Sequence, residues 1–316
     1  MGFNKVVVAG GGVLGSQIAL QTAVKGFDVA FWLRSEGSIG RTQPKMEQFR
    51  NAYLADLEAT KSMIGNPAAI YPRGLIDDFA NLTVEKVDAL KEQVNRAYDS
   101  IVYSTDMASV VSDADLVIES VSEKPADKKA FFEDLAKHLP EHTVIVTNSS
   151  TMLPSSFAEY TGRPEKFLAL HFANSIWRNN AAEVMGHAET EPAVYQKVVE
   201  FAKQIGMIPL QLKKEQPGYL LNSLLIPFLE AAEKLLVNEV SDPQTIDLAW
   251  MLGTGAPAGP CRILDIVGLE TAYNIITNKP EMADPNSMEV KIAAMLKGYI
   301  DAGKTGRNAG EGFYKY

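Results

Sequence analysis

Three glycines near the N-terminus have the spacing of a dinucleotide-binding turn. Gly10, Gly12 and Gly15 form G-x-G-x-x-G, directly after the apolar run 5–9 and before a helical pattern over 13–25. The first glycine permits a tight bend, the second lets the main chain approach a pyrophosphate, and the third lets helix and strand pack closely. The N–H groups that start the helix would then face the phosphates. The residues expected to hold a dinucleotide here are Gly10, Gly12, Val13, Leu14 and Gly15.

The end of the next apolar run carries an unusual charge for such a site. An NAD site places Asp or Glu there to accept from the ribose 2′-hydroxyl, whereas this chain has Arg34 and Ser35. Both side chains can hydrogen-bond a 2′-phosphate, with Arg41 as reinforcement, which favours NADP over NAD. The alternative left open is that Arg34 is a solvated surface residue and that Glu36 serves the ribose.

The elements that must position these residues alternate between strands and helices. Short apolar runs at 5–9, 28–33, 116–120, 143–147 and 167–172 read as strands, separated by helical segments. This order predicts an α/β fold with a Rossmann-type doubly wound sheet. Residues 44–98 are rich in Glu, Lys, Gln and Ala, and we expect them to form helices that project from the sheet.

The last third of the chain has a different pattern. After about residue 213 strand-like alternation disappears, and Gln216-Pro217-Gly218 marks a break in regular structure. We therefore predict a dinucleotide-binding domain over 1–213 and an all-helical C-terminal domain over 214–316. The expected helices span 220–237, 242–252, 269–277 and 289–302.

Composition and charge exclude several classes of function. The 316 residues include 30 basic and 39 acidic side chains, a formal charge of −9, so neither nucleic acid nor an anionic membrane is an expected partner. A lone cysteine, Cys261, excludes an intramolecular disulfide and a cysteine-based zinc site, and it agrees with a reducing compartment. Histidines and carboxylates do not cluster at metal-ligand spacing, so no metal is expected. Without an apolar run of about 18 residues, we expect a soluble cytoplasmic protein.

Seven short sequence blocks follow one another along the chain in a distinctive order and spacing. They are Gly10–Ser16, Asp115–Glu119, Thr147–Ser150, Leu170–Asn174, Pro217–Asn222, Leu252–Pro260 and Gly310–Tyr314. Together they resemble the L-3-hydroxyacyl-CoA dehydrogenase family, including its bacterial 3-hydroxybutyryl-CoA members, along nearly the whole length.

The resemblance implies a catalytic set. His171 matches the family's acid/base residue, Glu183 its partner, and Ser150 and Asn222 the polar residues near the reacting oxygen. Hydride transfer to a ketone builds negative charge on oxygen, and histidine is a suitable proton donor near neutral pH. Glu183 would fix the imidazole tautomer, while Ser150 and Asn222 would bond the developing oxyanion. We expect hydride transfer between NAD(P) and the 3-position of a short-chain 3-hydroxyacyl-CoA or 3-oxoacyl-CoA.

The resemblance also implies further contacts and an assembly. Glu119 and Lys124 match positions that line the cofactor, although each also reads as an ordinary strand-end or surface charge. The apolar helices of the C-terminal domain would help to bind substrate and form a homodimer, or they would only fill that domain's own core.

The chain departs from the family in ways that affect the substrate. Where members continue His-Phe-Phe-Asn-Pro, this chain has Ala173 and Ser175, and Asn308 replaces a lysine near the final glycines. Basic residues between 41 and 61 could meet CoA phosphates, or they could be ordinary helix-surface charges. One alternative is therefore a same-fold enzyme for a CoA-free hydroxy acid, polyol acid or diketone. Another is a dinucleotide-binding protein without turnover. The basic residues concerned are Arg41, Lys45, Arg50 and Lys61.

Overall fold

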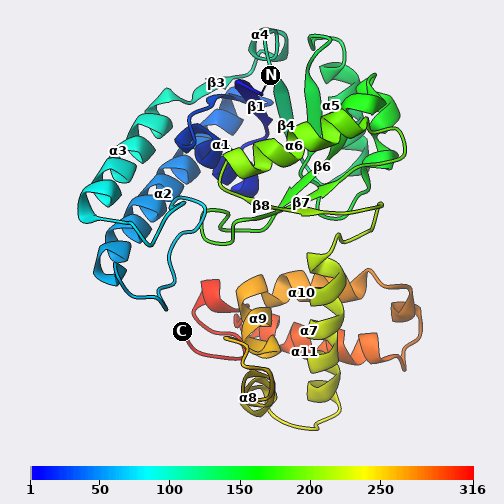
Figure 1. Cartoon of the computed structure of the whole chain (residues 1–316). Coiled ribbons are helices and arrows are strands. Elements are labelled where there is room, and N and C mark those ends of the chain that lie inside the picture. The colour runs from blue at the N-terminus through cyan, green and yellow to red at the C-terminus, as the bar shows by residue number, and fades with distance from the viewer. Residues whose placement is uncertain (1) are drawn as a thin grey trace. The chain divides into compact units, whose positions relative to one another are not determined.

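The computed structural model describes residues 2–316, which divide into two compact units, 2–220 and 221–316 (Figure 1). The first unit contains the whole sheet, and the second is helical. Among the described residues, no helix is both long and apolar enough to cross a membrane.

An eight-stranded sheet forms the centre of the first unit. Its strand order is β3-β2-β1-β4-β5-β6-β7-β8, and every neighbouring pair is parallel except β6 and β7, which are antiparallel. Parallel strands bring their carboxyl ends to one edge, where ligands bind in such sheets. The strands are β1 (Lys5–Ala9), β2 (Asp28–Trp32), β3 (Val102–Ser104), β4 (Leu116–Glu119), β5 (Val144–Thr147), β6 (Phe167–Phe172), β7 (Ala181–Met185) and β8 (Ile208–Gln211).

Helices cover both faces of this sheet. Alternate residues of β1 point to opposite faces, so Val6 and Val8 pack with α1, α2, α3 and α6, while Val7 and Ala9 pack with α4 and α5. The β1 residues on both faces are apolar and buried, as expected for a sheet covered on its two faces. The helices are α1 (Val13–Val24), α2 (Glu36–Thr60), α3 (Val84–Ser100), α4 (Met107–Val110), α5 (Pro125–Leu135) and α6 (Pro192–Gln204).

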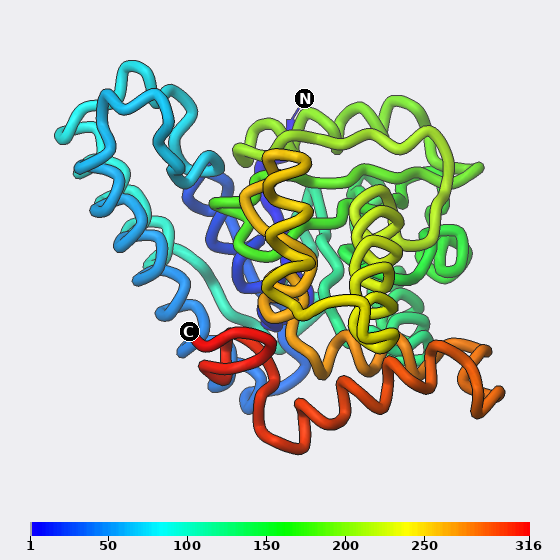
Figure 2. Tube along the Cα trace, turned by 90° about the horizontal axis from the view of Figure 1, so that it is seen from below, coloured from blue at the N-terminus to red at the C-terminus, as the bar shows by residue number. Residues whose placement is uncertain are grey.

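Helices α2 and α3 lie side by side and project from the sheet (Figures 1 and 2). A buried glutamine holds the base of this hairpin. The Gln21 amide donates to the carbonyl oxygens of Gly74 and Ile205, at 2.7 and 2.8 Å, and its oxygen accepts from the Tyr53 hydroxyl at 3.0 Å. The hairpin is thus tied to α1 by satisfied buried polar groups.

The second unit has its own apolar core, built around Leu229, Leu264 and Ile292. Two buried aspartates fasten its main chain. Asp247 accepts from the N–H groups of Cys261 and Arg262, and Asp265 accepts from those of Phe313 and Tyr314. Its helices are α7 (Leu221–Val237), α8 (Pro243–Thr254), α9 (Pro260–Val267), α10 (Leu269–Thr277) and α11 (Met288–Asp301).

The predicted fold class is confirmed: a Rossmann-type doubly wound sheet is followed by a helical part. Strands β3, β7 and β8 are absent from the sequence-based prediction. β3 has only three residues, β8 contains Pro209, and β7 places Glu183 inside an apolar run. Each feature weakens the strand signal, because prolines and buried carboxylates are uncommon in strands.

Candidate active site

A cavity of about 410 Å³ lies at the carboxyl ends of β1, β2 and β4. The glycine turn forms one wall, and Ser120, Val121 and Phe131 form another. A groove of this kind, at the point where strand order reverses, is the usual dinucleotide position in a doubly wound sheet.

The glycine turn has the geometry that the sequence pattern requires. Gly10 has φ +111°, and a Cβ there would lie 2.3 Å from the carbonyl oxygen of Ser120. A Cβ on Gly15 would lie 2.0 Å from the Gly10 carbonyl oxygen, whereas one on Gly12 would point into open space. Helix α1 starts beyond Gly12 without a side-chain cap or an acidic residue in its first turn. Its first N–H groups, those of Val13, Leu14 and Gly15, therefore suit a pyrophosphate.

Cations dominate the part of the cavity next to β2. Arg34, Arg41 and Lys45 line it, and the Lys45 ammonium lies 3.3 Å from the Gly11 carbonyl oxygen. Ser35 does not line the cavity; it caps α2 by accepting from the Ser38 N–H at 3.3 Å. Glu36 is also outside the lining, and its carboxylate accepts a 3.4 Å hydrogen bond from Thr105.

The pair His171 and Glu183 is held by strand register. The two residues are direct partners in the antiparallel pair β6 and β7, so their side chains share one face. The imidazole Nδ1 and the carboxylate Oε2 are 2.8 Å apart, and both side chains are buried. Glu183 Oε1 accepts from the Leu220 N–H at 2.8 Å. With Nδ1 bonded to the carboxylate, Nε2 is the ring nitrogen left to exchange a proton with a substrate.

A buried ion pair lies at the end of β4. Lys128 on α5 and Glu119 are 1% and 0% exposed, and their ammonium and carboxylate are 2.6 Å apart. Glu119 also accepts from the Thr147 hydroxyl at 2.6 Å and the Val121 N–H at 2.8 Å. Burial raises the pKa of Glu119, while the Lys128 charge and these hydrogen bonds oppose the rise. The protein thus satisfies the Glu119 carboxylate itself, and Glu119 does not line the cavity.

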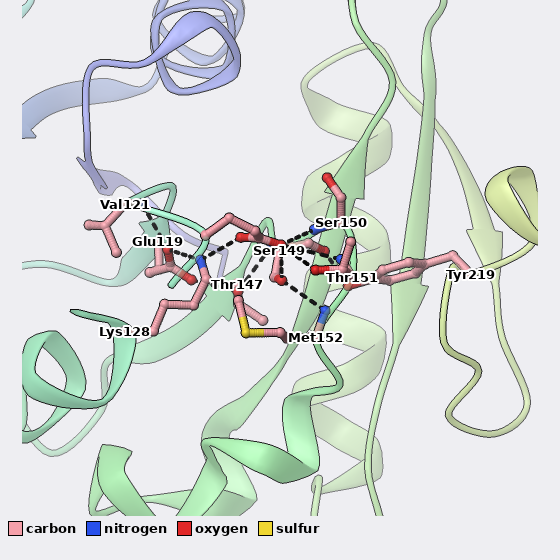
Figure 3. Close-up of polar contacts among 10 residues, drawn as sticks. Glu119, Val121, Lys128, Thr147, Ser149, Ser150, Thr151, Met152 and Tyr219 are labelled. Carbon is pink, nitrogen blue, oxygen red and sulfur yellow. Dashed lines mark hydrogen bonds and ion pairs between the residues drawn. The ribbon is translucent and has the colours of Figure 1, made fainter. Parts of the chain in front are cut away.

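The turn after β5 carries Ser150 (Figure 3), and the Glu123 carboxylate holds it by hydrogen bonds. One carboxylate oxygen accepts from the Ser149 hydroxyl at 2.5 Å, the Ser150 N–H at 2.9 Å and both the N–H and hydroxyl of Thr151. The other oxygen is 3.1 Å from the Lys128 ammonium. Burial acts to raise the pKa of Glu123, but the Ser149 hydrogen bond and Lys128 outweigh it, so the pKa falls below its ordinary value.

Tyr219 lies beside His171, from which it is 48 residues distant along the chain. Its ring stacks on the imidazole with centroids 4.5 Å apart and planes 22° apart. Its hydroxyl donates to the Ser149 carbonyl oxygen at 2.7 Å. Burial, and then the negative charges of Glu123 and Glu183, raise the pKa of this hydroxyl, which therefore stays protonated and able to donate.

The remaining predicted residues lie elsewhere. Lys124 is exposed at the start of α5, outside the cavity lining, and Asn222 lies in the first turn of α7, in the second unit. The four basic residues offered for CoA phosphates do not form one patch. Arg41 and Lys45 line the dinucleotide cavity, whereas Arg50 pairs with Glu47 and Lys61 pairs with Glu58 and Asp88.

Sequence reasoning missed three residues of this region: Glu123, Lys128 and Tyr219. One of them had a detectable signal, because Lys128 precedes Phe131 and Phe132 by three and four positions and so shares their buried helix face. Between residues 2 and 316, no three histidine, cysteine or carboxylate side chains group in a way that could hold a metal ion.

A glycine turn at the edge of a doubly wound sheet, with a buried histidine and glutamate pair in the same unit, defines a class: dinucleotide-dependent oxidoreductases. Two family profiles match nearly the whole chain. The "3-hydroxyacyl-CoA dehydrogenase, NAD binding domain" profile covers residues 5–216, and the corresponding C-terminal domain profile covers 218–316. The chain belongs to the 3-hydroxyacyl-CoA dehydrogenase family.

Individual relatives agree with this assignment. The mitochondrial hydroxyacyl-coenzyme A dehydrogenase of Sus scrofa is 33% identical over 98% of this chain and 90% of its own length. The 3-hydroxybutyryl-CoA dehydrogenase of Bradyrhizobium diazoefficiens is 28% identical over 99% and 95%. A solved diketoreductase, described as catalysing reactions of dicarbonyl compounds, is 45% identical over the full length of both chains, with a TM-score of 0.85. The expected family, the enzyme class and a nicotinamide dinucleotide cofactor are thereby confirmed, and the expected activity is confirmed at the level of the family.

Proposed function

We propose that this enzyme transfers a hydride between a nicotinamide dinucleotide and the 3-position of a short-chain 3-hydroxyacyl-CoA or 3-oxoacyl-CoA. The observation that carries the proposal is the buried His171 and Glu183 pair, 2.8 Å apart at the edge of the sheet that also forms the dinucleotide cavity. The dinucleotide supplies or accepts the hydride, and the protein supplies the proton chemistry.

His171 acts as the acid/base in this proposal. Glu183 accepts from Nδ1–H and so fixes the tautomer, which leaves Nε2 to protonate the substrate oxygen during reduction or to remove its proton during oxidation. A negative carboxylate also stabilises the imidazolium form that donates the proton. Burial of both side chains strengthens these interactions by excluding water.

Ser150 and Asn222 stabilise the developing oxyanion by donating hydrogen bonds to it. Support for Ser150 comes from its fixed main chain, because its N–H is bonded to Glu123 while Tyr219 holds the adjacent Ser149 carbonyl group. Asn222 is half-buried near the start of α7, and its part in the site rests on the family resemblance.

Reduction of acetoacetyl-CoA, followed by loss of cofactor absorbance, tests this function. The wild-type enzyme is expected to turn it over, and His171→Gln is expected to lower kcat by about a thousandfold. His142→Gln is the matched control, because the His142 side chain is exposed and its Nε2 lies 3.4 Å from the Asp115 carboxylate. Equal turnover by wild type and His171→Gln would refute the assignment.

A second candidate substrate is a CoA-free 1,3-dicarbonyl compound. The 45% identity to a diketoreductase favours it, as does the loop after β6, the strand that carries His171. In that loop Ala173 follows β6 directly, and Ser175 has φ +59°. Proline, which family members usually have at the position of Ser175, cannot adopt this backbone conformation. A CoA-free 3-oxo ester assayed beside acetoacetyl-CoA separates the candidates. The larger kcat/KM identifies the substrate class.

We also propose a preference for NADP(H) over NAD(H). Arg34 and Arg41 line the cavity beside the end of β2 and suit a 2′-phosphate, while Glu36 is bonded to Thr105 outside the lining. Arg34→Asp is expected to shift the ratio of kcat/KM values toward NADH by about a hundredfold. Arg96→Asp, a substitution on the exposed face of α3, is the control. A wild-type preference for NADH above about tenfold, some 1.4 kcal/mol, would overturn this proposal.

We further propose that the helical domain, residues 214–316, contributes to substrate binding and forms a homodimer in the cytoplasm. The support is the family resemblance together with exposed apolar side chains such as Leu224 and Leu252. Sedimentation of the wild-type protein tests the assembly, and a monomer at micromolar concentration would contradict it. Cell fractionation tests the location.

A further inference from the structure

Tyr219 has a backbone conformation that large side chains rarely adopt. It closes a turn in which its N–H donates to the Gln216 carbonyl oxygen at 3.0 Å, and its φ is +55°. Residues with a bulky side chain seldom occupy this left-handed region, and they persist there when several contacts impose it. Tyr219 is also 1% exposed, so the conformation is not a solvent-side irregularity.

Three of the contacts made by Tyr219 and the next residue reach the catalytic groups. The ring stacks on His171, the hydroxyl donates to the Ser149 carbonyl oxygen, and the next N–H, that of Leu220, donates to Glu183. Figure 3 shows Tyr219 approaching the turn of Ser149, Ser150 and Thr151 from the side opposite Glu119 and Lys128.

We propose that Tyr219 is a positioning residue that couples the two parts of the catalytic site: its ring sets the imidazole plane of His171, and its hydroxyl holds the turn that carries Ser150. This inference rests on the proposed roles of His171 and Ser150. It assigns separate tasks to the ring and to the hydroxyl, which can be removed one at a time.

The turn that carries Ser150 is hydrogen-bonded by Glu123 and by Tyr219, so loss of the Tyr219 hydroxyl would remove one of its two supports. Glu123 bonds the Ser149 hydroxyl and the N–H groups of Ser150 and Thr151, while Tyr219 bonds the Ser149 carbonyl oxygen. Phenylalanine at 219 would keep the stacking but leave that carbonyl group without this donor. The turn could then shift relative to His171, and small displacements of reacting groups lower the reaction rate strongly.

The test is a double-mutant cycle on kcat, using acetoacetyl-CoA and the CoA-free 3-oxo ester as probes. Tyr219→Phe is expected to lower kcat about tenfold while leaving the KM for the dinucleotide unchanged. In a Ser150→Ala background the same change is expected to cost less than about twofold, because the hydroxyl acts through Ser150. Tyr53→Phe is the matched control. It also removes a fully buried hydroxyl, bonded to Gln21 rather than to the site, and should leave kcat unchanged in both backgrounds.

The outcomes separate this inference from the proposed function. Wild-type kcat in Tyr219→Phe, or an equal loss with and without Ser150, would overturn the inference while His171→Gln remained inactive. A larger dinucleotide KM without a fall in kcat would also overturn it. An unimpaired Ser150→Ala enzyme, or a wild-type enzyme that reduces neither probe, would refute the proposed function and this inference with it.

Discussion

Buried carboxylates occur in both units, but they bond to different kinds of partner. In the first unit, the buried Glu183 accepts from an imidazole, and the exposed Glu123 accepts from the turn that carries Ser150. In the second, Asp265 accepts from two main-chain N–H groups and from the Tyr316 hydroxyl. Burial of an acid is therefore no sign of a catalytic site. The partners decide whether the carboxylate serves chemistry or fastens the main chain.

The largest effect should come from replacing a carboxylate that bonds a catalytic side chain. Glu183→Gln keeps the size of the side chain but removes the charge that stabilises an imidazolium, so kcat should fall about a thousandfold. Steady-state assays measure kcat, and fluorescence titration should show unchanged dinucleotide affinity. Glu189→Gln, an exposed neighbour beyond β7, is the control. A fall of less than about tenfold would place Glu183 with the structural acids.

Replacing a carboxylate that bonds the main chain should lower stability and leave kcat unchanged. Asp265→Ala leaves the N–H groups of Phe313 and Tyr314 and the Tyr316 hydroxyl without their acceptor, at a cost of about 3 to 5 kcal/mol in unfolding free energy. Urea unfolding measures the loss, and Asp301→Asn on the exposed end of α11 is the control. Below the unfolding transition, kcat should stay near the wild-type value. A catalytic loss without destabilisation would reverse the distinction.

Glu233 lies in the second unit, and no hydrogen bond to its carboxylate is found among residues 2–316. Burial, and then the charge of Glu230, raise the pKa of this carboxyl from 4.5 to about 7. Between these two values the folded state binds more protons than the unfolded state, so stability falls as pH rises through this window and stays lower above it. Glu233→Gln should therefore add about 2 kcal/mol at pH 8 and much less at pH 5.

Thermal and urea unfolding at the two pH values check this prediction. Glu270→Gln, an exposed substitution on α10, is the control and should change stability little at either pH. A gain for Glu233→Gln that is equal at pH 5 and pH 8 would show that the Glu233 charge does not oppose folding.

The smallest expected effect concerns the acid that holds the Ser150 turn. Glu123→Gln keeps an acceptor oxygen but weakens the bonds to Ser149 and Thr151, so kcat should fall about tenfold, some 1.4 kcal/mol. Steady-state kinetics with both probes measure it. Glu133→Gln on the exposed face of α5 is the control. If stability falls while kcat is retained, Glu123 belongs with Asp265.

Local patterns in the chain predicted five of the eight strands and the glycine turn, because each of these depends on neighbours in sequence. The strand at 5–9 and the glycines that follow it lie within one continuous segment, and alternation and spacing report such segments well. The pairing of His171 with Glu183 came from the family resemblance. No local pattern shows that two strands will be antiparallel neighbours.

The rest depended on contacts between distant segments. Lys128 shares a helix face with Phe131 and Phe132, which indicates burial, but no local pattern shows that its partner there is Glu119. Tyr219 reads as an ordinary aromatic beside a Pro-Gly turn. Its stacking on His171 arises only because residues 219–220, after the last strand, contact the turn after β5 and Glu183 on β7. The spacing of residues along one segment carries no information about contacts with a distant segment.

The register of β6 and β7 has a consequence for how this enzyme can diverge. His171 and Glu183 face each other because they are cross-strand partners, and the length of the chain between them does not set their distance. Residues 173–180 can therefore gain, lose or exchange amino acids while the acid/base pair stays in place, provided that pairing of the two strands survives. Selection for new substrates can act on this segment without rebuilding the chemistry, so substrate range and reaction type can evolve separately.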